Sequence, residues 1–390
     1  MSTPWRPGNG KNCRANVAWL SDLCRQGCKI ASFIRFRLAR VPDSCRPLRL
    51  AINGYGRIGR CFLRALVESP VGHNLQVVAI NEPANLESIA YLSRYDSTHG
   101  RFPGRVEVGT ASLLIDGRPI AVSHARTPEE VDWAALGIDL LIECSGAYGR
   151  RPELSRFLDA GCPRLLLSHP GFSGDDVDAT IVAGINQQTL TGTERLVSAA
   201  SCTTNAIVPL LALLDREVGI DQALLTTLHS VMNDQPLIDG YHHDDLRRTR
   251  SAMQSIIPVS TGLARGVERL LPQLAGRVQA KAIRVPTLNV SAIDLTITTQ
   301  RPVSAHSINT LLADAAVGPL EKLIAYSEAA HASIDFNHDP HSAIVDGSQT
   351  RTGGTHLVNL FVWFDNEWGF ANRMLEVADH WSRLWPANNT

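Results

Sequence analysis

One glycine motif constrains the fold of this chain more than any other feature of its sequence. Gly54, Gly56 and Gly59 are spaced as GxGxxG, directly after the apolar run Leu48–Asn53. The first glycine of such a motif permits a tight turn, the second lets backbone approach a pyrophosphate, and the third lets a helix pack closely on a strand. Apolar periodicity over Arg57–Glu68 predicts that helix. A lone GxGxxG can mark only a tight turn, but its place at the start of a βαβ unit predicts a dinucleotide site.

An acidic residue follows the second expected strand. The apolar run Leu75–Ile80 ends at Asn81 and Glu82, which is farther from the glycines than the usual ~20 residues. A carboxylate at this place accepts both ribose hydroxyls and repels a 2′-phosphate. Glu82 therefore favours NAD over NADP, and the alternative is a solvated acid at a strand end.

The two halves of the chain differ in their apolar patterns. Further short apolar strands are expected in the first half at Ile138–Cys144, Arg164–Ser168, Thr180–Ala183 and Leu196–Ala200. Strands that alternate with helices indicate an α/β fold with a parallel, doubly wound sheet. Longer alternating segments follow at Ala223–His229, Ala282–Pro286, Ala292–Thr299 and His356–Phe364. These predict an α+β domain with a mixed or antiparallel sheet.

These patterns predict the domain organisation. We expect an NAD-binding domain over residues 48–201 and a catalytic domain over 202–366, with the C-terminal helix of 367–390 returning to the first domain. Residues 1–47 carry nine Lys or Arg against two Asp and no motif, so we expect a disordered extension. It can be a transit-type leader or a stretch that is not normally made, and we favour the second interpretation.

Composition argues against several other classes of protein. The chain has a formal net charge of −1 although its first 47 residues are basic, so the remaining body is acidic, which argues against a nucleic-acid groove. No apolar run approaches the ~18 residues that span a bilayer. The eight cysteines show no paired CxxC motifs, and Cys24 and Cys28 lack a nearby His pair. We therefore expect no metal site and mostly buried thiols in a reducing compartment, the cytoplasm.

One cysteine stands apart from the others. Cys202 lies between an expected strand and the apolar helix Ala206–Leu214, flanked by the hydroxyls of Ser201 and Thr203. A helix N-terminus favours thiolate over thiol, so Cys202 is a candidate nucleophile. His229 ends an apolar strand and is the candidate base, although a lone His at a strand end is more often structural.

Basic and hydroxyl side chains suited to a phosphate follow. Arg284 lies within an apolar strand, where a guanidinium needs an anionic partner. Arg248 belongs to the run Arg247–Arg250, any member of which can instead be a solvated or subunit-contact residue. Thr261 and Gly262 add a hydroxyl and an open backbone N–H.

Five segments together resemble the glyceraldehyde-3-phosphate dehydrogenase superfamily. They are INGYGRIGR, YDSTHGRF, ASCTTN, RVPTLNVS and WFDNEWGFANRM, in the right order between Leu48 and Trp385. Within it the chain is more similar to the D-erythrose-4-phosphate dehydrogenase branch than to the glycolytic branch. That closer likeness rests on SHPG, DLRRTRSAMQSIIPVSTG and FNHDPHSAIVDGSQTR.

The resemblance implies a Rossmann domain, a catalytic domain, a homotetramer, and an NAD-dependent oxidation of a sugar-phosphate aldehyde, erythrose 4-phosphate, toward vitamin B6. It implies Cys202 as nucleophile and His229 as its activator. It places Arg57, Ile58, Arg126 and Asn366 on NAD, with Asn366 on the nicotinamide amide. It places Ser201, Thr203, Arg248, Thr261, Gly262 and Arg284 on the substrate. The alternatives are a phosphorylating glyceraldehyde-3-phosphate dehydrogenase and a non-catalytic NAD- or RNA-binding relative.

Several positions depart from the family pattern. Met232 stands where the glycolytic enzymes have a phosphate-binding Thr, which argues against the glycolytic substrate. Gly240 replaces a Pro in the cofactor loop, and Phe370 replaces a Tyr near the nicotinamide. The segment His242–Asp245 is one residue longer than in the relatives, so the choice of Arg248 among its neighbours stays open.

Overall fold

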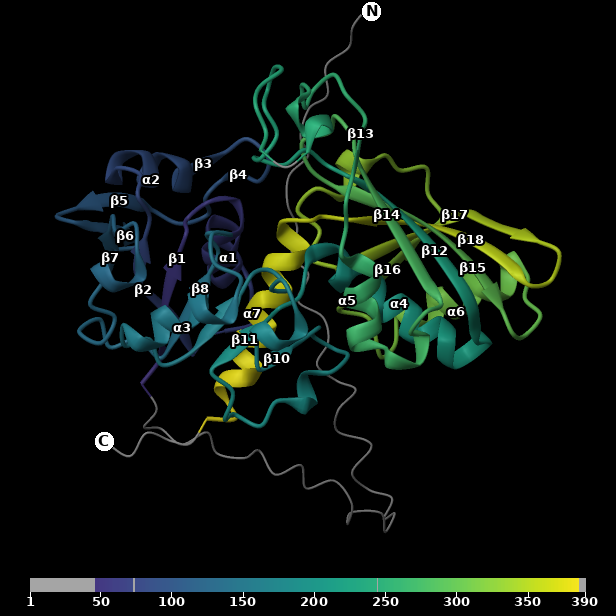
Figure 1. Ribbon diagram of the computed structural model, residues 1–390, viewed down its shortest axis with the longest axis horizontal. Coiled ribbons are helices and arrows are strands. Elements are labelled where there is room, and N and C mark those ends of the chain that lie inside the picture. Colours follow the sequence, from purple (N-terminus) through teal and green to yellow (C-terminus); the bar gives the residue numbers. More distant parts are fainter. Residues whose placement is uncertain (1–45, 73, 244, 386–390) are drawn as a thin grey trace, which may run out of the picture. The chain divides into compact units, whose positions relative to one another are not determined.

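The computed structural model of the chain describes residues 46–385, except for residues 73 and 244 (Figure 1). The expected extension, residues 1–47, lies almost wholly outside the described residues. Two large sheets carry the fold, a nine-stranded one and a seven-stranded one. The α/β fold class predicted from the sequence is confirmed.

The first sheet has the strand order β10-β11-β9-β8-β1-β2-β7-β6-β5. Its strands are β1 (Leu48–Asn53), β2 (Leu75–Asn81), β5 (Val106–Gly109), β6 (Ser112–Ile115), β7 (Arg118–Ser123), β8 (Leu140–Glu143), β9 (Leu165–Leu167), β10 (Ala179–Thr180) and β11 (Leu196–Ser198). Neighbours from β10 to β7 run parallel, and β6 and β5 extend the sheet antiparallel. The small ribbon of β3 (Tyr95–Asp96) and β4 (Gly100–Arg101) stands apart from it.

Alternate residues of the central strands face opposite layers of helices. Leu50 and Ile52 of β1 belong to a core with α1 (Arg57–Glu68) and α7 (Trp368–Ser382), whereas Ala51 belongs to a core with α3 (Arg151–Asp159). Such strands are buried on both faces, as in doubly wound sheets. Helix α2 (Leu86–Arg94) packs beside the antiparallel edge. Since α7 packs directly against α1, the end of the described chain joins the core of the first sheet.

The strand and helix predictions agree best where apolar periodicity is strong. β1 and α1 begin and end where the sequence predicts. The strand expected at Thr180–Ala183 is wrong in extent, because only Ala179–Thr180 pairs with β11 and the chain then turns. The antiparallel strands β5 and β6 were not expected, because each has only four residues.

The second sheet has the order β13-β14-β12-β15-β18-β17-β16 and mixes parallel and antiparallel pairs. Its strands are β12 (Ile220–His229), β13 (Ile257–Val259), β14 (Val278–Arg284), β15 (Ser291–Thr299), β16 (Ile324–Ser327), β17 (Ala343–Gly353) and β18 (Leu357–Phe364). Helices α4 (Cys202–Val218), α5 (Leu263–Leu270) and α6 (Ala305–Ala316) share one core with this sheet. Its other face carries half-exposed side chains such as Leu224, so the mixed sheet expected from the alternating segments is confirmed.

Short 3₁₀ turns complete the described chain at Pro128–Glu130, Gly174–Asp176, Gln187–Thr189, Leu246–Thr249, Pro272–Leu274 and Ser333–Phe336. Among the residues that the structure describes, none of the helices is both long and apolar enough to cross a bilayer.

Candidate active site

A sharp turn delivers Cys202 to the first position of α4. After β11 the chain passes through Ala200, whose φ of 62° lies in the left-handed region that non-glycine residues rarely adopt. Ser201 then caps the helix, its hydroxyl accepting from the N–H of Thr204. The buried amide of Asn205 donates to the carbonyls of Ala199 and Ser201 and so holds the turn closed. The left-handed residue and the capped helix start together fix the backbone position of Cys202 as the first residue of α4.

His229 meets this sulfur from the end of β12. Its Nε2 lies 3.7 Å from the Cys202 Sγ. Its Nδ1 lies 2.8 Å from the carbonyl oxygen of Ser230, which can only accept a hydrogen bond. Nδ1 therefore carries a proton, and Nε2 is the nitrogen left to exchange a proton with the sulfur.

The pair is poised to ionise. Burial alone raises the pKa of the Cys202 thiol, but the hydrogen bond and positive charge of His229 outweigh it and hold that pKa below its ordinary value. Burial alone lowers the pKa of His229, but the Cys202 thiolate and the Ser230 carbonyl raise it above its ordinary value. Both shifts favour a thiolate beside an imidazolium, which is a nucleophile with an adjacent acid–base group.

The glycine loop is shaped for an anion at the N-terminus of α1. Gly54 has φ 83°, and a Cβ there would lie 2.4 Å from the backbone of Ser145. A Cβ on Gly59 would lie 2.4 Å from the carbonyl oxygen of Gly54. Apart from its own chain neighbours, no atom of the described residues lies within 4 Å of the Cβ position at Gly56, so the backbone there is open to a ligand. The backbone N–H groups of Arg57 and Ile58 begin the helix and have no partner within it.

A pocket adjoins the glycine loop and contains the expected ribose acid. Its lining includes Gly54, Gly56, Glu82, Arg126 and Ser145. The Glu82 carboxylate accepts from the backbone N–H of Tyr55 at 2.9 Å and of Ala84 at 3.2 Å, which fixes it at the pocket wall. The structure thus brings Glu82 and Arg126 together with the glycines.

Arg57 points elsewhere. Its guanidinium forms ion pairs with Asp96 and Glu367, linking α1 to the residues that precede α7. Any contact of Arg57 with NAD therefore has to come from its backbone N–H.

Asn366 has a fixed orientation. Its Oδ1 accepts from the buried hydroxyls of Ser230 at 3.0 Å and Ser291 at 2.9 Å. Its Nδ2 has no partner among the described residues, so it is the group left to donate to a carboxamide oxygen. The backbone carbonyl of Ser230 also accepts from His229 Nδ1, so this one residue orients both Asn366 and His229.

The predicted phosphate-binding arginines converge on a carboxylate. Arg284 contacts both oxygens of Asp234, at 2.8 and 3.2 Å, and Arg248 pairs with the same carboxylate. Arg284 is paired in register with His229 across β14 and β12. Met232 lies against the same guanidinium, with its sulfur 3.5 Å from Nη2. An anion site is therefore built beside the catalytic pair, and Asp234 now fills it.

The remaining predicted substrate residues lie at helix starts. The Thr203 hydroxyl is 3.8 Å from the Cys202 sulfur. Gly262 is the N-cap of α5, and the preceding Thr261 accepts from the N–H of Leu263 at 3.2 Å. Helices α4 and α5 pack together, and a Cβ at Gly266 of α5 would lie 3.3 Å from the Thr204 hydroxyl, so the first turn of α4 lies against α5.

Three residues of this region were not identified from the sequence. Asn205 holds the turn before Cys202, Asp234 holds the two arginines, and Glu143 is fully buried beside Asn53 at the end of β8. Burial raises the pKa of Glu143 to about 7, despite hydrogen bonds from Ser145 and Asn53. No spacing motif marks any of the three.

A dinucleotide fold, an activated cysteine with its histidine and an adjacent anion site together define an NAD-dependent dehydrogenase that acts on phosphorylated aldehyde sugars. The comparisons with known families agree. Residues 48–151 match the NAD binding domain of glyceraldehyde 3-phosphate dehydrogenase, and residues 201–366 match its C-terminal domain. The chain belongs to the glyceraldehyde 3-phosphate dehydrogenase family, and its cofactor is NAD.

Proposed function

We propose that the chain oxidises D-erythrose 4-phosphate to 4-phosphoerythronate, a step toward vitamin B6. The support is the resemblance of its 168–171, 245–262 and 336–351 segments to that branch of the family, together with the environment of Met232. The observation that carries the proposal is the contact between Met232 and Arg284. At the position where glycolytic relatives have a phosphate-binding Thr, a thioether faces the guanidinium and cannot donate a hydrogen bond.

The residues support a covalent route. The Cys202 thiolate attacks the aldehyde carbon and forms a C–S bond, and the carbonyl oxygen takes a proton from the His229 imidazolium to become the hydroxyl of a hemithioacetal. NAD, when bound, supplies the acceptor for the hydride that leaves this carbon. His229 accepts the hydroxyl proton as the thioester forms. The backbone N–H of Cys202, at the first position of α4, and the imidazole stabilise the oxyanion, and water then releases the acid and restores the thiol.

The ion pairs of Asp234 determine how a substrate phosphate can bind. Its carboxylate already occupies the two guanidinium groups that a substrate phosphate needs. A phosphate therefore binds by displacing or sharing this carboxylate. A four-carbon substrate carries its phosphate one carbon farther from the aldehyde than a three-carbon one. We propose that this longer reach, with Arg284, Arg248, Thr203 and Thr261 as donors, replaces the site that Met232 weakens.

The test is a comparison of two aldehydes at equal concentration. We expect kcat/KM to be at least ~10-fold higher for erythrose 4-phosphate than for glyceraldehyde 3-phosphate, as one interaction of about 1.4 kcal/mol yields. Inorganic phosphate should accelerate the reaction little. Met232→Thr should move the preference toward the three-carbon aldehyde, whereas Met232→Leu, which adds no hydroxyl at the same position, serves as the control. A strict phosphate requirement with a three-carbon preference would return the chain to the glycolytic group.

A non-catalytic relative is the second alternative. The 3.7 Å contact of Cys202 with His229 disfavours it, because a protein that only binds NAD or RNA has no need of an activated thiol. Absence of NADH formation with either aldehyde, in a chain that still binds NAD, would favour this alternative.

We also propose a homotetramer that acts in the cytoplasm. Large apolar side chains stand exposed between residues 237 and 256, among them Leu237, Ile238, Tyr241, Leu246 and Ile256. Exposed apolar groups gathered in one segment are typical of subunit contacts. Light scattering after size exclusion tests the assembly, and a monomer at micromolar concentration would contradict it.

A further inference from the structure

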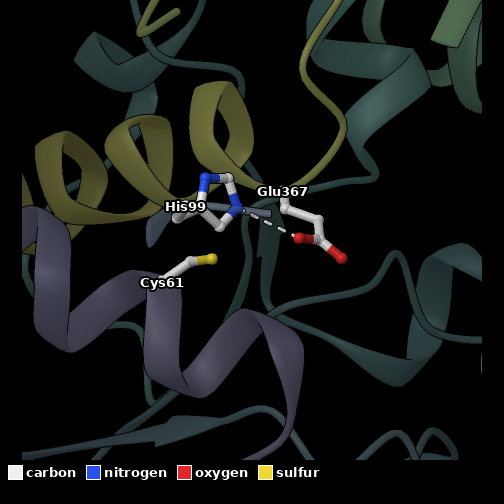
Figure 2. Close-up of side chains that lie close together, drawn as sticks. All are labelled: Cys61, His99 and Glu367. Carbon is white, nitrogen blue, oxygen red and sulfur yellow. Dashed lines mark hydrogen bonds and ion pairs between the residues drawn. The ribbon is translucent and has the colours of Figure 1, made fainter. Parts of the chain in front are cut away.

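Cys61, His99 and Glu367 form a buried cluster that the proposed reaction does not use. Cys61 lies on α1, His99 in the turn between β3 and β4, and Glu367 immediately before α7, and Figure 2 shows the three side chains approaching one another. Their ligand atoms all lie within 4.8 Å of one another. The side chain of His99 is fully buried, and that of Glu367 is 13% exposed. A thiol, an imidazole and a carboxylate are the three groups that zinc accepts most often in proteins.

The chain of polar contacts through His99 has three contacts but only two protons when both imidazoles are neutral. His99 Nε2 lies 3.1 Å from Glu367 Oε2, and His99 Nδ1 lies 3.0 Å from His338 Nδ1. His338 Nε2 lies 2.8 Å from Glu68 Oε2. Both carboxylates can only accept hydrogen bonds, and each neutral imidazole carries one proton. Two neutral rings can therefore fill only two of these three contacts, and one pair of acceptors is left face to face.

The Nε2–Oε2 contact is the place where a cation resolves this conflict. If His338 donates to Glu68 and His99 Nδ1 donates to His338, the lone pair of His99 Nε2 faces Glu367. The sulfur of Cys61 adjoins these two acceptors. A metal-bound histidine ordinarily donates its other ring N–H to a chain of this kind, ending on a carboxylate.

The charges around the sulfur also favour a cation. The carboxylates of Glu367, Asp365 and Asp96 place negative charge near the Cys61 sulfur. The positive guanidinium of Arg57 offsets part of that charge. Arg57 donates from Nε to Glu367 Oε1 and from Nη2 to Oε2. Each carboxylate oxygen has two lone pairs, so Oε2 keeps one that is directed to His99.

We propose that Cys61, His99 and Glu367 bind a divalent transition-metal ion of the zinc class. Zinc holds sulfur at about 2.3 Å and nitrogen or oxygen at about 2.0–2.2 Å, which places ligand atoms roughly 3.2–3.7 Å apart. The nitrogen and oxygen, 3.1 Å apart, lie just below this range, and the sulfur lies within 4.8 Å of both. Binding displaces the thiol proton to solvent and forms the metal–sulfur bond.

The three residues leave a fourth coordination position of the ion for a water molecule. The ion links α1, the β3–β4 turn and the residue that precedes α7. That residue, Glu367, directly follows Asn366. Its ligands are separated by more than 300 residues in the sequence, from Cys61 to Glu367. This is why no spacing motif showed a metal site, and why none was expected.

The test measures metal in the full chain with Cys202 replaced by Ser, because the catalytic pair also offers a thiol and an imidazole. After incubation with zinc and removal of free metal, we compare this parent with Cys61→Ser and with Cys162→Ser added to it. Cys162 is a matched control, since it is a buried thiol outside the cluster. We expect Cys61→Ser to lose one zinc ion per chain and Cys162→Ser to keep it. With cobalt as the probe, the thiolate-to-metal absorption should fall only in Cys61→Ser.

Equal zinc content in the two variants would overturn the proposal. A third proton on the His99–His338 pair, in place of a metal ion, would then complete the three hydrogen bonds. Should Cys61→Ser not fold, anomalous diffraction at the zinc edge from crystals of the unaltered chain decides the question. A peak among Cys61, His99 and Glu367 supports the site, and its absence in zinc-soaked crystals refutes it.

Discussion

Replacing His229 by Asn removes the imidazole that faces the catalytic sulfur. In the structure Sγ and Nε2 are 3.7 Å apart. Unit charges at this distance attract each other by about 4 kcal/mol at an effective dielectric constant of about 20. If half of this attraction is lost when the site rearranges and water enters, about 2 kcal/mol remains, which corresponds to a ~30-fold smaller thiolate population at a pH where the thiol is mostly protonated.

Alkylation by iodoacetamide measures this population directly. We expect His229→Asn to slow modification of Cys202 by ~30-fold at about pH 6, and the rate of modification in the variant to rise only at a higher pH than in the unaltered protein, because burial then raises the thiol pKa unopposed. Turnover should fall further, by 10²–10⁴-fold, because the general base is lost as well. The Cys202→Ser variant corrects for the other thiols. A change below about threefold at the lower pH would refute the ion-pair interpretation.

Three further outcomes are expected. Cys202→Ser should abolish NADH formation by several orders of magnitude while leaving NAD binding and the melting temperature nearly unchanged, and substantial residual turnover would remove Cys202 from its role. Glu143→Gln should flatten the pH dependence of stability. The pKa of Glu143 is raised from 4.5 to about 7, so between these two values the folded chain keeps a proton that the unfolded chain loses. The free energy of unfolding of the unaltered protein therefore falls by roughly 3 kcal/mol as the pH rises from about 4.5 to about 7. Urea titrations at both ends of the window check this, and an unchanged slope in the variant would contradict it. A chain that begins at Leu48 should match the full chain in melting temperature and activity, since among the described residues before it only the exposed Arg46 pairs with the body.

The strongest local patterns predicted the fold, and contacts between distant residues escaped prediction. GxGxxG with flanking apolar periodicity located β1 and α1 because local geometry requires those residues. Strands β5 and β6 are short and partly exposed, so they show too little alternation to be recognised.

The same division applies to the candidate site. Cys202 could be identified from its place before a helix. Its activation by His229 depends on a turn through Ala200 that has no sequence signature. Asp234 and Glu143 are ordinary acids in the sequence, and their importance arises only from the arginines and the burial that the fold gives them.

Three consecutive residues at the junction of β18 and α7 have three separate tasks. Asp365 accepts from the N–H groups of Glu367 and Trp368 and so starts the helix, Asn366 presents its amide, and Glu367 holds Arg57. A mutagenesis library that varied this segment to admit altered nicotinamide analogues would lose folded protein along with selectivity. Engineering of cofactor choice therefore has better prospects at the other end of the dinucleotide, around Glu82 and Arg126, where the side chains line a pocket.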